Sequence, residues 1–344
     1  MHASIAGIEY YLPETTITTE DLAAMFPERP IKKIASKTGV QSRSIASDEE
    51  CASDLAVAAA QKLFESGSCK PDKVDFVLFC TQSPDYVFPT TACLLQERLG
   101  IPTSAGALDF NLGCSGFVYG LGLAEGLISS GQARSVLLIT AETCSKYLGE
   151  RDIAVRALLG DGAAATWVTC QDAGPVTIGP FVYGTDGRGG KNMIVLNSGS
   201  RKSKEVNSLC AKDQGSGLVR QPLFMDGQKI FDFAIETVPK SVSALLGKSG
   251  LAMEDIDLFV FHQANAYLLE EIRRLIGIPK EKFQLTISHC ANTSSSTIPI
   301  ALKHAELDGR LERGNRVMLV GFGVGYSWAA TIIQWAGFSK SREG

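Results

Sequence analysis

The sequence predicts an α/β fold that consists of two duplicated halves, because segments of the first half recur in the second. Three pairs of segments match in the same order, at offsets of 178 to 182 residues: 74–80 with 256–262, 109–131 with 285–309, and 134–140 with 316–321. One chance match of this kind would mean little, but three in the same order indicate that a single unit occurs twice.

The first pair of matching segments has the composition of buried strands. Segments 74–80 and 256–262 are short, apolar, and rich in β-branched and aromatic residues, and an aspartate stands near the start of each. Helix-like stretches precede them at 52–66 and 231–248. Each half therefore begins its repeated unit with a helix followed by a strand.

The second pair predicts a strand, a turn and a helix in each half. Both segments start like a strand, pass through small residues and continue as a helix that stops at Gly131 or Gly309. Because helices and strands alternate, we expect a mostly parallel sheet with crossover helices in each half. We place the boundary near Gly174, which gives halves of 1–174 and 175–344.

Composition excludes several classes of protein. The 344 residues are 45% hydrophobic and 20% charged, as expected for a globular core, and the net charge of -4 argues against nucleic-acid binding. No cationic leader precedes an apolar stretch and no apolar run reaches ~20 residues, so we expect a cytoplasmic protein without a membrane span. The nine cysteines are odd in number and form no CxxC pair, which favours reduced thiols and no metal site.

The register of the repeat brings three reactive side chains to one region. Cys114 lies 17 residues before Gly131, and Asn292 lies 17 residues before Gly309, so the two occupy equivalent turns. His262 ends the strand that corresponds to the one ending at Cys80. Sites usually assemble at the carboxyl ends of parallel strands, and we therefore expect these three residues to share a cleft.

Each of the three residues has a functional and a structural interpretation. At a helix N-terminus the Cys114 thiol should have a lowered pKa and act as a nucleophile in acyl transfer, whereas a buried structural cysteine is the alternative. His262 is either catalytic or a satisfied core histidine. Asn292 is either a helix cap or, since it does not titrate, a hydrogen-bond donor to a developing oxyanion.

The glycine-rich segment 321–325 (GFGVG) resembles a dinucleotide-binding loop only superficially. The residues after it, YSWAATIIQW, have the pattern of a strand and not of a helix. We expect instead a tight turn that offers a backbone N–H group to the active site.

Four motifs together resemble the β-ketoacyl-acyl-carrier-protein synthase III family of the thiolase-like superfamily. They are GCSGF around Cys114, HQAN from His262, NTS from Asn292, and the terminal GFGVGYSWA, and the resemblance covers nearly the whole chain. It implies a thiolase-like fold, in which two α/β halves form a five-layered αβαβα sandwich. It also implies that Cys114, His262 and Asn292 form a Cys-His-Asn catalytic triad.

The resemblance implies a decarboxylative Claisen condensation in fatty acid or secondary-metabolite biosynthesis. Cys114 would accept an acyl group, usually from acyl-CoA, and the acyl-enzyme would then meet a malonyl thioester on acyl carrier protein. His262 and Asn292 would stabilise the enolate, and the backbone amides of Cys114 and Val324 would form the oxyanion hole. No metal or bound cofactor is implied.

The same resemblance supplies a set of substrate-binding residues and partners. The set comprises Lys37, Phe88, Arg151, Gly227, Phe231 and Asn265, with Arg273 and Arg274 as possible contacts for an acidic carrier protein. Phe88 would shape an acyl pocket across the interface of a homodimer. Gly227, Phe231 and Asn265 would line the pantetheine tunnel.

Several positions differ from the family pattern and bear on the substrate. The tryptophan that stacks on the CoA adenine is absent from segment 29–33, and Lys37 replaces an arginine, which removes the bidentate fork. Tyr267 and Asp232 replace basic residues of the carrier-docking patch. We therefore expect a specialised homologue that takes a carrier-bound or longer acyl primer.

Other activities of the same fold remain alternatives. One is an acyltransferase that forms an ester, amide or thioester without decarboxylation, which would not require both His262 and Asn292. Others are a head-to-head or type III polyketide-like condensing enzyme, and a non-catalytic partner subunit, which the presence of Cys114 disfavours.

Overall fold

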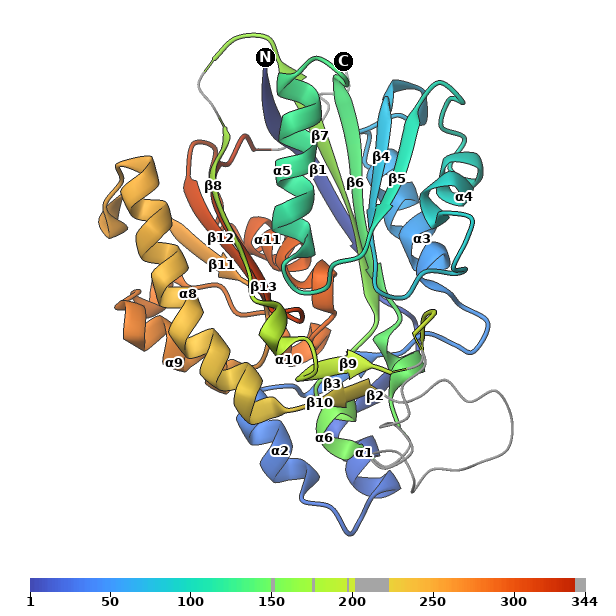
Figure 1. Cartoon of the computed structure of the whole chain (residues 1–344), viewed down its shortest axis with the longest axis vertical. Helices are drawn as coiled ribbons and strands as arrows, with labels where there is room; N and C mark the ends of the chain where they lie inside the picture. The colour runs from blue at the N-terminus through green and yellow to red at the C-terminus, as the bar shows by residue number, and fades with distance from the viewer. Residues whose placement is uncertain (150–151, 175–176, 197, 202–222, 338–344) are drawn as a thin grey trace.

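The computed structural model describes residues 1–149, 152–174, 177–196, 198–201 and 223–337, and these residues form a sandwich of five layers (Figure 1). Two sheets each carry helices on their outer face, and two further helices lie between the sheets. The predicted thiolase-like αβαβα arrangement is thus confirmed.

The first sheet is built entirely from the N-terminal half. Its strand order is β1-β7-β6-β4-β5, with bounds His2–Tyr11, Gly162–Gln171, Ser135–Glu142, Phe76–Cys80 and Gly106–Phe110. β4 pairs in parallel with both β5 and β6, whereas β7 is antiparallel to β6 and β1. The predicted strand at 74–80 is therefore the centre of the parallel part of this sheet.

The second sheet repeats this order with one strand fewer. Its order is β11-β12-β13-β8, with bounds Leu258–Phe261, Arg316–Gly323, Ser327–Gln334 and Ile178–Thr185. β11 and β12 are parallel, and the other two pairings are antiparallel. An isolated bridge between Phe259 and Phe283 stands where β5 lies in the first sheet.

Two expectations about these sheets were wrong. Both sheets are mixed and not mostly parallel: in the first, β7 is antiparallel to both β6 and β1, and in the second, β12 returns directly into β13 through a tight turn, which can only join antiparallel strands. The strand expected at the start of segment 285–309 is instead the short helix α10, Ile287–Cys290. The amide of Gln41 donates to the carbonyl of Ser288 within it, so this segment pairs with the N-terminal half and not with β11.

The helices lie where the repeat predicts them. α3 (Ala52–Glu65) and α4 (Thr91–Arg98) cover the outside of the first sheet, and α8 (Gly227–Ser249) and α9 (Ala266–Ile276) cover the outside of the second. α5 (Gly116–Ser129) and α11 (Thr297–Leu307) lie between the sheets. Both central helices are followed by a glycine with positive φ, Gly131 at 75° and Gly309 at 67°, as a helix stop requires.

Apolar burial follows the layers. One core cluster joins the two sheets through α5 and α11 and includes Phe117, Leu121 and Leu302, each 0% exposed. Two further clusters lie under α3 and α4 and under α8 and α9. Because the two halves share the central cluster, the positions of α5 and α11 depend on both sheets.

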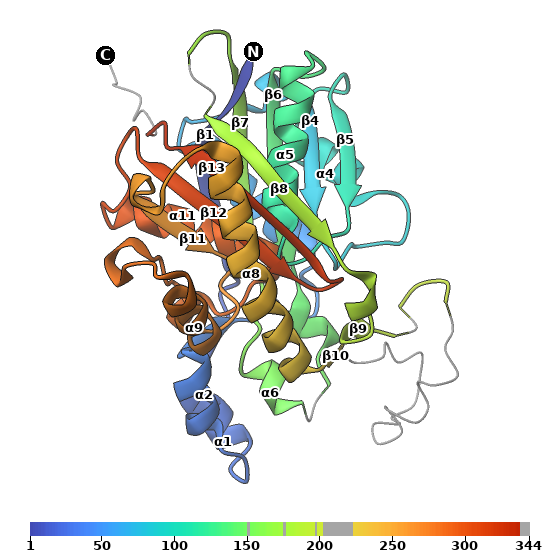
Figure 2. The same ribbon diagram turned by 60° about the vertical axis from the view of Figure 1, so that its left-hand side comes forward.

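Smaller elements form a lobe beside the carboxyl ends of the strands (Figure 2). They are β2 (Thr16–Thr18), α1 (Thr19–Met25), α2 (Ile31–Thr38), β3 (Ser42–Ser44), α6 (Ile153–Arg156), β9 (Met193–Val195) and β10 (Leu223–Met225). Short 3-10 helices occur at Pro71–Lys73, Cys144–Tyr147, Gly187–Gly189, Met253–Asp255, Lys280–Lys282 and Ser294–Ser296. Leu22, Ile31, Ile153 and Ala157 form the core of the lobe.

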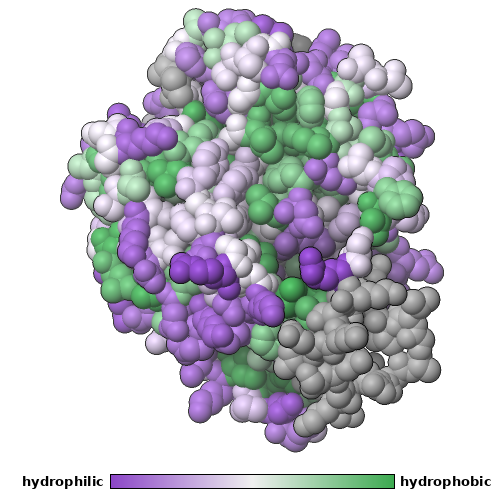
Figure 3. All heavy atoms as spheres, in the orientation of Figure 1, coloured by the Kyte–Doolittle hydropathy of each residue, from purple (hydrophilic) through white to green (hydrophobic). Residues whose placement is uncertain are grey.

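The surface differs between the two halves on the face that Figure 3 shows. Apolar side chains gather over α5, whereas hydrophilic ones cover the N-terminal half of α8. Among the described helices, none combines the length and apolar character that a membrane crossing requires. The proposed division of the halves falls between residues 174 and 175, and residue 175 lies outside the described residues.

Candidate active site

Cys114 lies at the N-terminal end of α5, as predicted, and is only 8% exposed. Glycines allow this close packing. A Cβ atom at Gly116 would overlap the sulfur of Cys80, and one at Gly323 would lie 2.7 Å from the Cys114 sulfur. The cysteine turn therefore touches the ends of β4 and β12 directly, which larger residues at these two positions would prevent.

The net pKa shift of the Cys114 thiol is opposite to the prediction. Burial raises its pKa to about 11, and the carboxyl of Glu142 adds to this increase. Hydrogen bonds from the Ser294 hydroxyl and from the backbone amides of Val324 and Cys114 lower it in part. Desolvation in the closed pocket thus outweighs the local donors at the helix terminus.

His262 follows β11 directly and is 2% exposed. Burial lowers its pKa to about 3, so the imidazole is neutral at pH 7. Its Nδ1 atom lies 2.7 Å from the hydroxyl of Thr297, and its ring packs edge-on against Phe322, with 5.6 Å between the ring centroids. The same hydroxyl lies 3.0 Å from the carbonyl of Ser294, and when it donates to Nδ1 in place of that carbonyl, Nε2 carries the ring proton and can donate to a substrate.

Asn292 is held at both its backbone and its side chain. Its amide donates to the carbonyl of Leu158, and its own carbonyl accepts from Gly160, each at 3.1 Å. Its Oδ1 atom accepts from the amide of Ser294 at 2.9 Å, and Nδ2 donates to the carbonyl of Ala264 at 3.3 Å. One N–H of the side chain remains for a substrate. Asn292 does not cap α11, whose N-cap is Ser296.

Ser294 connects the three predicted residues, and sequence reasoning missed it. Its hydroxyl bonds to the Cys114 sulfur, its carbonyl interacts with His262, and its amide donates to Asn292. It has a φ of 53°, which is uncommon for a residue other than glycine. The run TSSST is one sequence signal for it, since five consecutive hydroxyl residues stand at the start of a helix.

Glu142 was also missed, although it lies at the end of β6 beside this site. It is fully buried and accepts hydrogen bonds from the amide of Gln82 and from the hydroxyls of Ser83 (3.2 Å) and Ser295 (3.0 Å). Burial raises its pKa to about 8 despite these donors. A single acidic residue at the end of an apolar strand gives no sequence signal for such burial.

The terminal turn lies over the cysteine, as expected. β12 and β13 form a hairpin whose turn carries Val324, and the amide of Val324 is directed at the Cys114 sulfur. Tyr326 anchors the turn, because its hydroxyl accepts from Asn192 at 2.7 Å and donates to the carbonyl of Lys229 at 3.1 Å. A strand follows this turn, so the dinucleotide-loop interpretation is excluded.

The residues expected to bind substrate lie on several different elements of the fold. Phe231 stacks on Tyr267, with ring centroids 5.9 Å apart, and Asn265 caps α9 by accepting from the amide of Leu268. Gly227 is the first residue of α8, and Lys37 is exposed in the last turn of α2. Phe88 is 84% exposed, and Arg151 lies outside the described residues.

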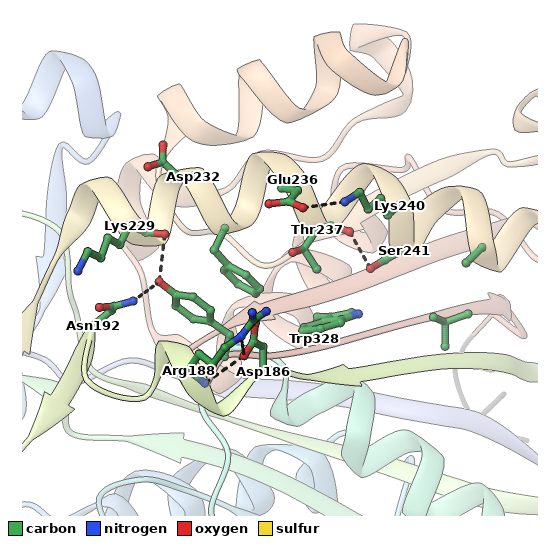
Figure 4. Close-up of a pocket in the computed structure, with 14 residues that line it drawn as sticks. Asp186, Arg188, Asn192, Lys229, Asp232, Glu236, Thr237, Lys240, Ser241 and Trp328 are labelled. Carbon is green, nitrogen blue, oxygen red and sulfur yellow. Dashed lines mark hydrogen bonds and ion pairs between the residues drawn. The ribbon is translucent and has the colours of Figure 1, made fainter.

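A separate pocket of about 600 Å³ lies between α8 and the strands β8 and β13 (Figure 4). None of Cys114, His262 and Asn292 lines it. Four of its charged side chains form two ion pairs, Asp186 with Arg188 at 2.6 Å and Glu236 with Lys240 at 2.7 Å. Within the described part of the chain, no group of three metal-ligating side chains is suitably placed to bind a metal ion.

Comparison with known proteins agrees with this geometry. The family model of 3-oxoacyl-[acyl-carrier-protein] synthase III matches residues 108–187, and the model of its C-terminal part matches residues 246–335. The chain is 35% identical to β-ketoacyl-[acyl-carrier-protein] synthase III of Caldanaerobacter subterraneus subsp. tengcongensis, over 97% of this chain and 98% of the relative.

Solved structures give the same result. A crystal structure of 3-oxoacyl-(acyl-carrier-protein) synthase III superposes with a TM-score of 0.92 and 48% identity, covering 97% of this chain and all of the other. The priming β-ketosynthase of the R1128 polyketide pathway superposes with a TM-score of 0.87 and 26% identity, covering 98% of this chain and 97% of the other. The chain therefore belongs to the β-ketoacyl-acyl-carrier-protein synthase III family and is a condensing acyltransferase.

Proposed function

We propose that Cys114, His262 and Asn292 carry out the decarboxylative condensation of this acyltransferase. One observation supports this more than any other: Ser294 contacts the sulfur, the imidazole and the asparagine side chain at once. Because all three groups contact Ser294, they lie close enough together to act on one thioester. They are a buried sulfur, a neutral imidazole and a primary amide.

In the first half-reaction the Cys114 sulfur attacks the carbonyl of an acyl thioester. The tetrahedral oxyanion receives hydrogen bonds from the amides of Cys114 and Val324, and its collapse expels the thiol of the donor. The acyl group then remains on Cys114 as a thioester. The pKa of about 11 requires that ionisation of the thiol accompanies substrate binding or attack.

In the second half-reaction a malonyl thioester loses carbon dioxide. The bond between its C2 atom and the carboxylate breaks, and the electron pair moves into an enolate whose oxygen accepts from His262 Nε2 and Asn292 Nδ2. Each such donor is worth about 3 kcal/mol in a transition state. C2 then attacks the acyl carbonyl, Cys114 leaves as thiolate, and a β-ketoacyl thioester is released.

The substrates and partners in this proposal follow the family. Acyl-CoA or an acyl carrier protein delivers the primer, malonyl carrier protein delivers the extender, and neither a metal nor a bound cofactor takes part. We also propose a cytoplasmic homodimer. Apolar exposure supports the dimer: Leu108 on edge strand β5 is 47% exposed and Val87, next to Phe88, is 86% exposed, in addition to the apolar surface over α5 (Figure 3).

Acyl transfer without decarboxylation is the alternative, and the donors beside Cys114 disfavour it. A plain transfer forms one oxyanion, for which the amides of Cys114 and Val324 suffice. Asn292 would then have no oxyanion to stabilise, and His262, whose pKa burial lowers to about 3, would be a poor base for activating an acceptor.

Two measurements test the proposal. Incubation with a panel of acyl-CoA and acyl-carrier donors, followed by mass spectrometry, should show one acyl group on the peptide that contains Cys114. Addition of malonyl carrier protein should then release carbon dioxide and yield a β-ketoacyl thioester. Cys114→Ala should lose loading by at least ~10⁴-fold. Loading of the wild-type protein at another residue, or product formation without carbon dioxide, would contradict the mechanism.

A further inference from the structure

The arginines expected to contact a carrier protein are already engaged within α9. The guanidinium of Arg273 forms two hydrogen bonds with Glu270, at 2.7 and 2.8 Å, and a third with the carbonyl of Ile278, and its side chain is only 15% exposed. Arg274 pairs with Glu270 at 2.9 Å and with Glu271 at 3.6 Å. These two arginines are thus balanced by two carboxylates, and Arg273 is not free to bind a partner.

A different group of cations is unpaired. Lys32, Lys33 and Lys37 are all exposed on α2, where Lys33 and Lys37 are neighbours at i, i+4 spacing and Lys32 lies about 100° around the helix from Lys33. None of the three forms an ion pair with a described residue. Ile31, 1% exposed, holds the opposite side of α2 in the lobe. We call the surface made by these three lysines the lysine face.

The helix that carries the lysine face adjoins the start of α9, which follows His262 in the chain. Gly39, at a φ of 75° after the end of α2, contacts Ala266 so closely that a Cβ atom there would overlap it. Tyr267, the next residue in α9, is 54% exposed and stacks on Phe231. The end of α2 therefore adjoins the start of α9, where Asn265, one of the residues expected to line the pantetheine tunnel, lies two residues before Tyr267.

We propose that the lysine face of α2, together with Tyr267, docks an acidic helix of the acyl carrier protein that delivers the thioester. This inference rests on the proposed function. From Lys32 to Lys37 the face extends about 8 Å along the helix axis, at 1.5 Å per residue. Such a row suits several carboxylates along a partner helix better than it suits a single phosphate group. Tyr267 supplies apolar contact where the family has a basic residue.

The charge pattern predicts how docking depends on salt. Exposed cations act over about one Debye length, ~8 Å at physiological ionic strength, and mainly increase the rate of encounter. The KM for malonyl carrier protein should therefore rise as salt is added. The paired arginines of α9 should contribute little to this dependence.

Kinetics of the full-length enzyme with three extenders test the proposal. Lys32→Glu/Lys33→Glu should raise the KM for malonyl carrier protein by ~10-fold or more and flatten its salt dependence. The same variant should leave the reaction with malonyl-pantetheine, which has neither carrier nor nucleotide, unchanged. Lys70→Glu/Lys73→Glu is the matched control, since these lysines are also exposed and lie at the amino end of β4.

Each other outcome has a distinct meaning. An equal rise in KM for malonyl-CoA and malonyl carrier protein would assign the lysine face to the nucleotide phosphates and overturn the proposal. An unchanged KM for malonyl carrier protein would also overturn it. Failure of the wild-type enzyme to condense even malonyl-pantetheine would instead refute the proposed function, which keeps the two failures separate.

Discussion

The turns that precede α5 and α11 occupy equivalent places in the two halves, but they differ in the kind of residue they contain. The first turn is glycine-rich, and Gly113 and Gly116 let it pack closely against Gln82 and the sulfur of Cys80, at the end of β4. The second turn is a run of hydroxyl residues after Asn292, all of them buried. Duplication thus produced one framework for two different local chemistries.

This difference separates two tasks. The first turn offers one reactive atom and backbone donors, which suit attack on an acyl carbonyl. The second turn offers side-chain donors in fixed orientations, which suit an enolate oxygen. Ser294 belongs to the second turn and contacts the Cys114 sulfur of the first, so the two tasks meet at this residue. Substitutions in the first turn should therefore impair loading, and substitutions in the second turn should impair condensation.

The largest expected effects come from substitutions that impair condensation but not loading of Cys114. Asn292→Asp keeps the shape and the Oδ1 acceptor for Ser294 but removes the N–H donors, and His262→Ala removes the imidazole. Each should lower decarboxylation and condensation by ~10²- to 10³-fold. Loading of Cys114 from acyl-CoA should stay within ~3-fold of wild type.

Stopped assays of acyl-enzyme formation and carbon dioxide release measure the two half-reactions separately. Cys114→Ala provides the reverse control, because it should abolish loading while malonyl decarboxylation continues. If Asn292→Asp slowed loading as much as condensation, the two turns would not have separate roles.

A smaller effect should come from Thr297, which we infer sets the tautomer of His262. Thr297→Val removes the hydroxyl at 2.7 Å from Nδ1 and should slow condensation by ~10-fold, the value of about one hydrogen bond. Thr297→Ser keeps the hydroxyl and should retain most of the activity. Because burial lowers the pKa of His262 to about 3, condensation should show no inflection near pH 6.5 in either variant. A titration near that pH would show that the imidazole is solvated.

Prediction from sequence succeeded where a pattern repeats or a motif is specific. The repeat located β4 and β11, the helix stops at Gly131 and Gly309, and the three residues that Ser294 connects. It failed on strand direction, because the alternation of helices and strands does not apply to β7 and β13, which are antiparallel to the strands beside them. It also failed at segment 285–290, where contacts with the N-terminal half hold a short helix in place of a strand.

The electrostatics of the site were harder to predict from the sequence than the identity of its residues. The pKa of the Cys114 thiol depends on how completely two sheets and a hairpin exclude water, and no local motif encodes that. The pairing of Arg273 with Glu270 was similarly hidden, although their i, i+3 spacing is visible in the sequence. Spacing permits an ion pair, but burial of the arginine to 15% exposure is what removes it from the surface.

The smallest expected effect concerns Glu142, which lies between the two turns and near the sulfur. Its pKa of about 8 exceeds the ordinary value near 4.3, so the folded protein binds its proton more tightly than the unfolded chain. The stability that this implies is fully present below about pH 4 and is lost as pH rises through 8. Glu142→Gln should abolish this dependence, so its stability relative to wild type should increase from pH 5 to pH 9.

The same substitution should change the reactivity of Cys114 at high pH. The charged carboxylate raises the pKa of the thiol, so Glu142→Gln should accelerate alkylation by iodoacetamide by ~3-fold above pH 8 and have little effect at pH 6. Glu97→Gln removes an exposed carboxylate on α4 and should change neither profile. The glutamine oxygen can still accept from the amide of Gln82 and from one of the hydroxyls of Ser83 and Ser295, and the other hydroxyl can rotate to accept from the glutamine N–H. Equal alkylation profiles for Glu142→Gln and wild type would mean that the carboxyl group only supports the packing of the two turns and does not influence the sulfur through its charge.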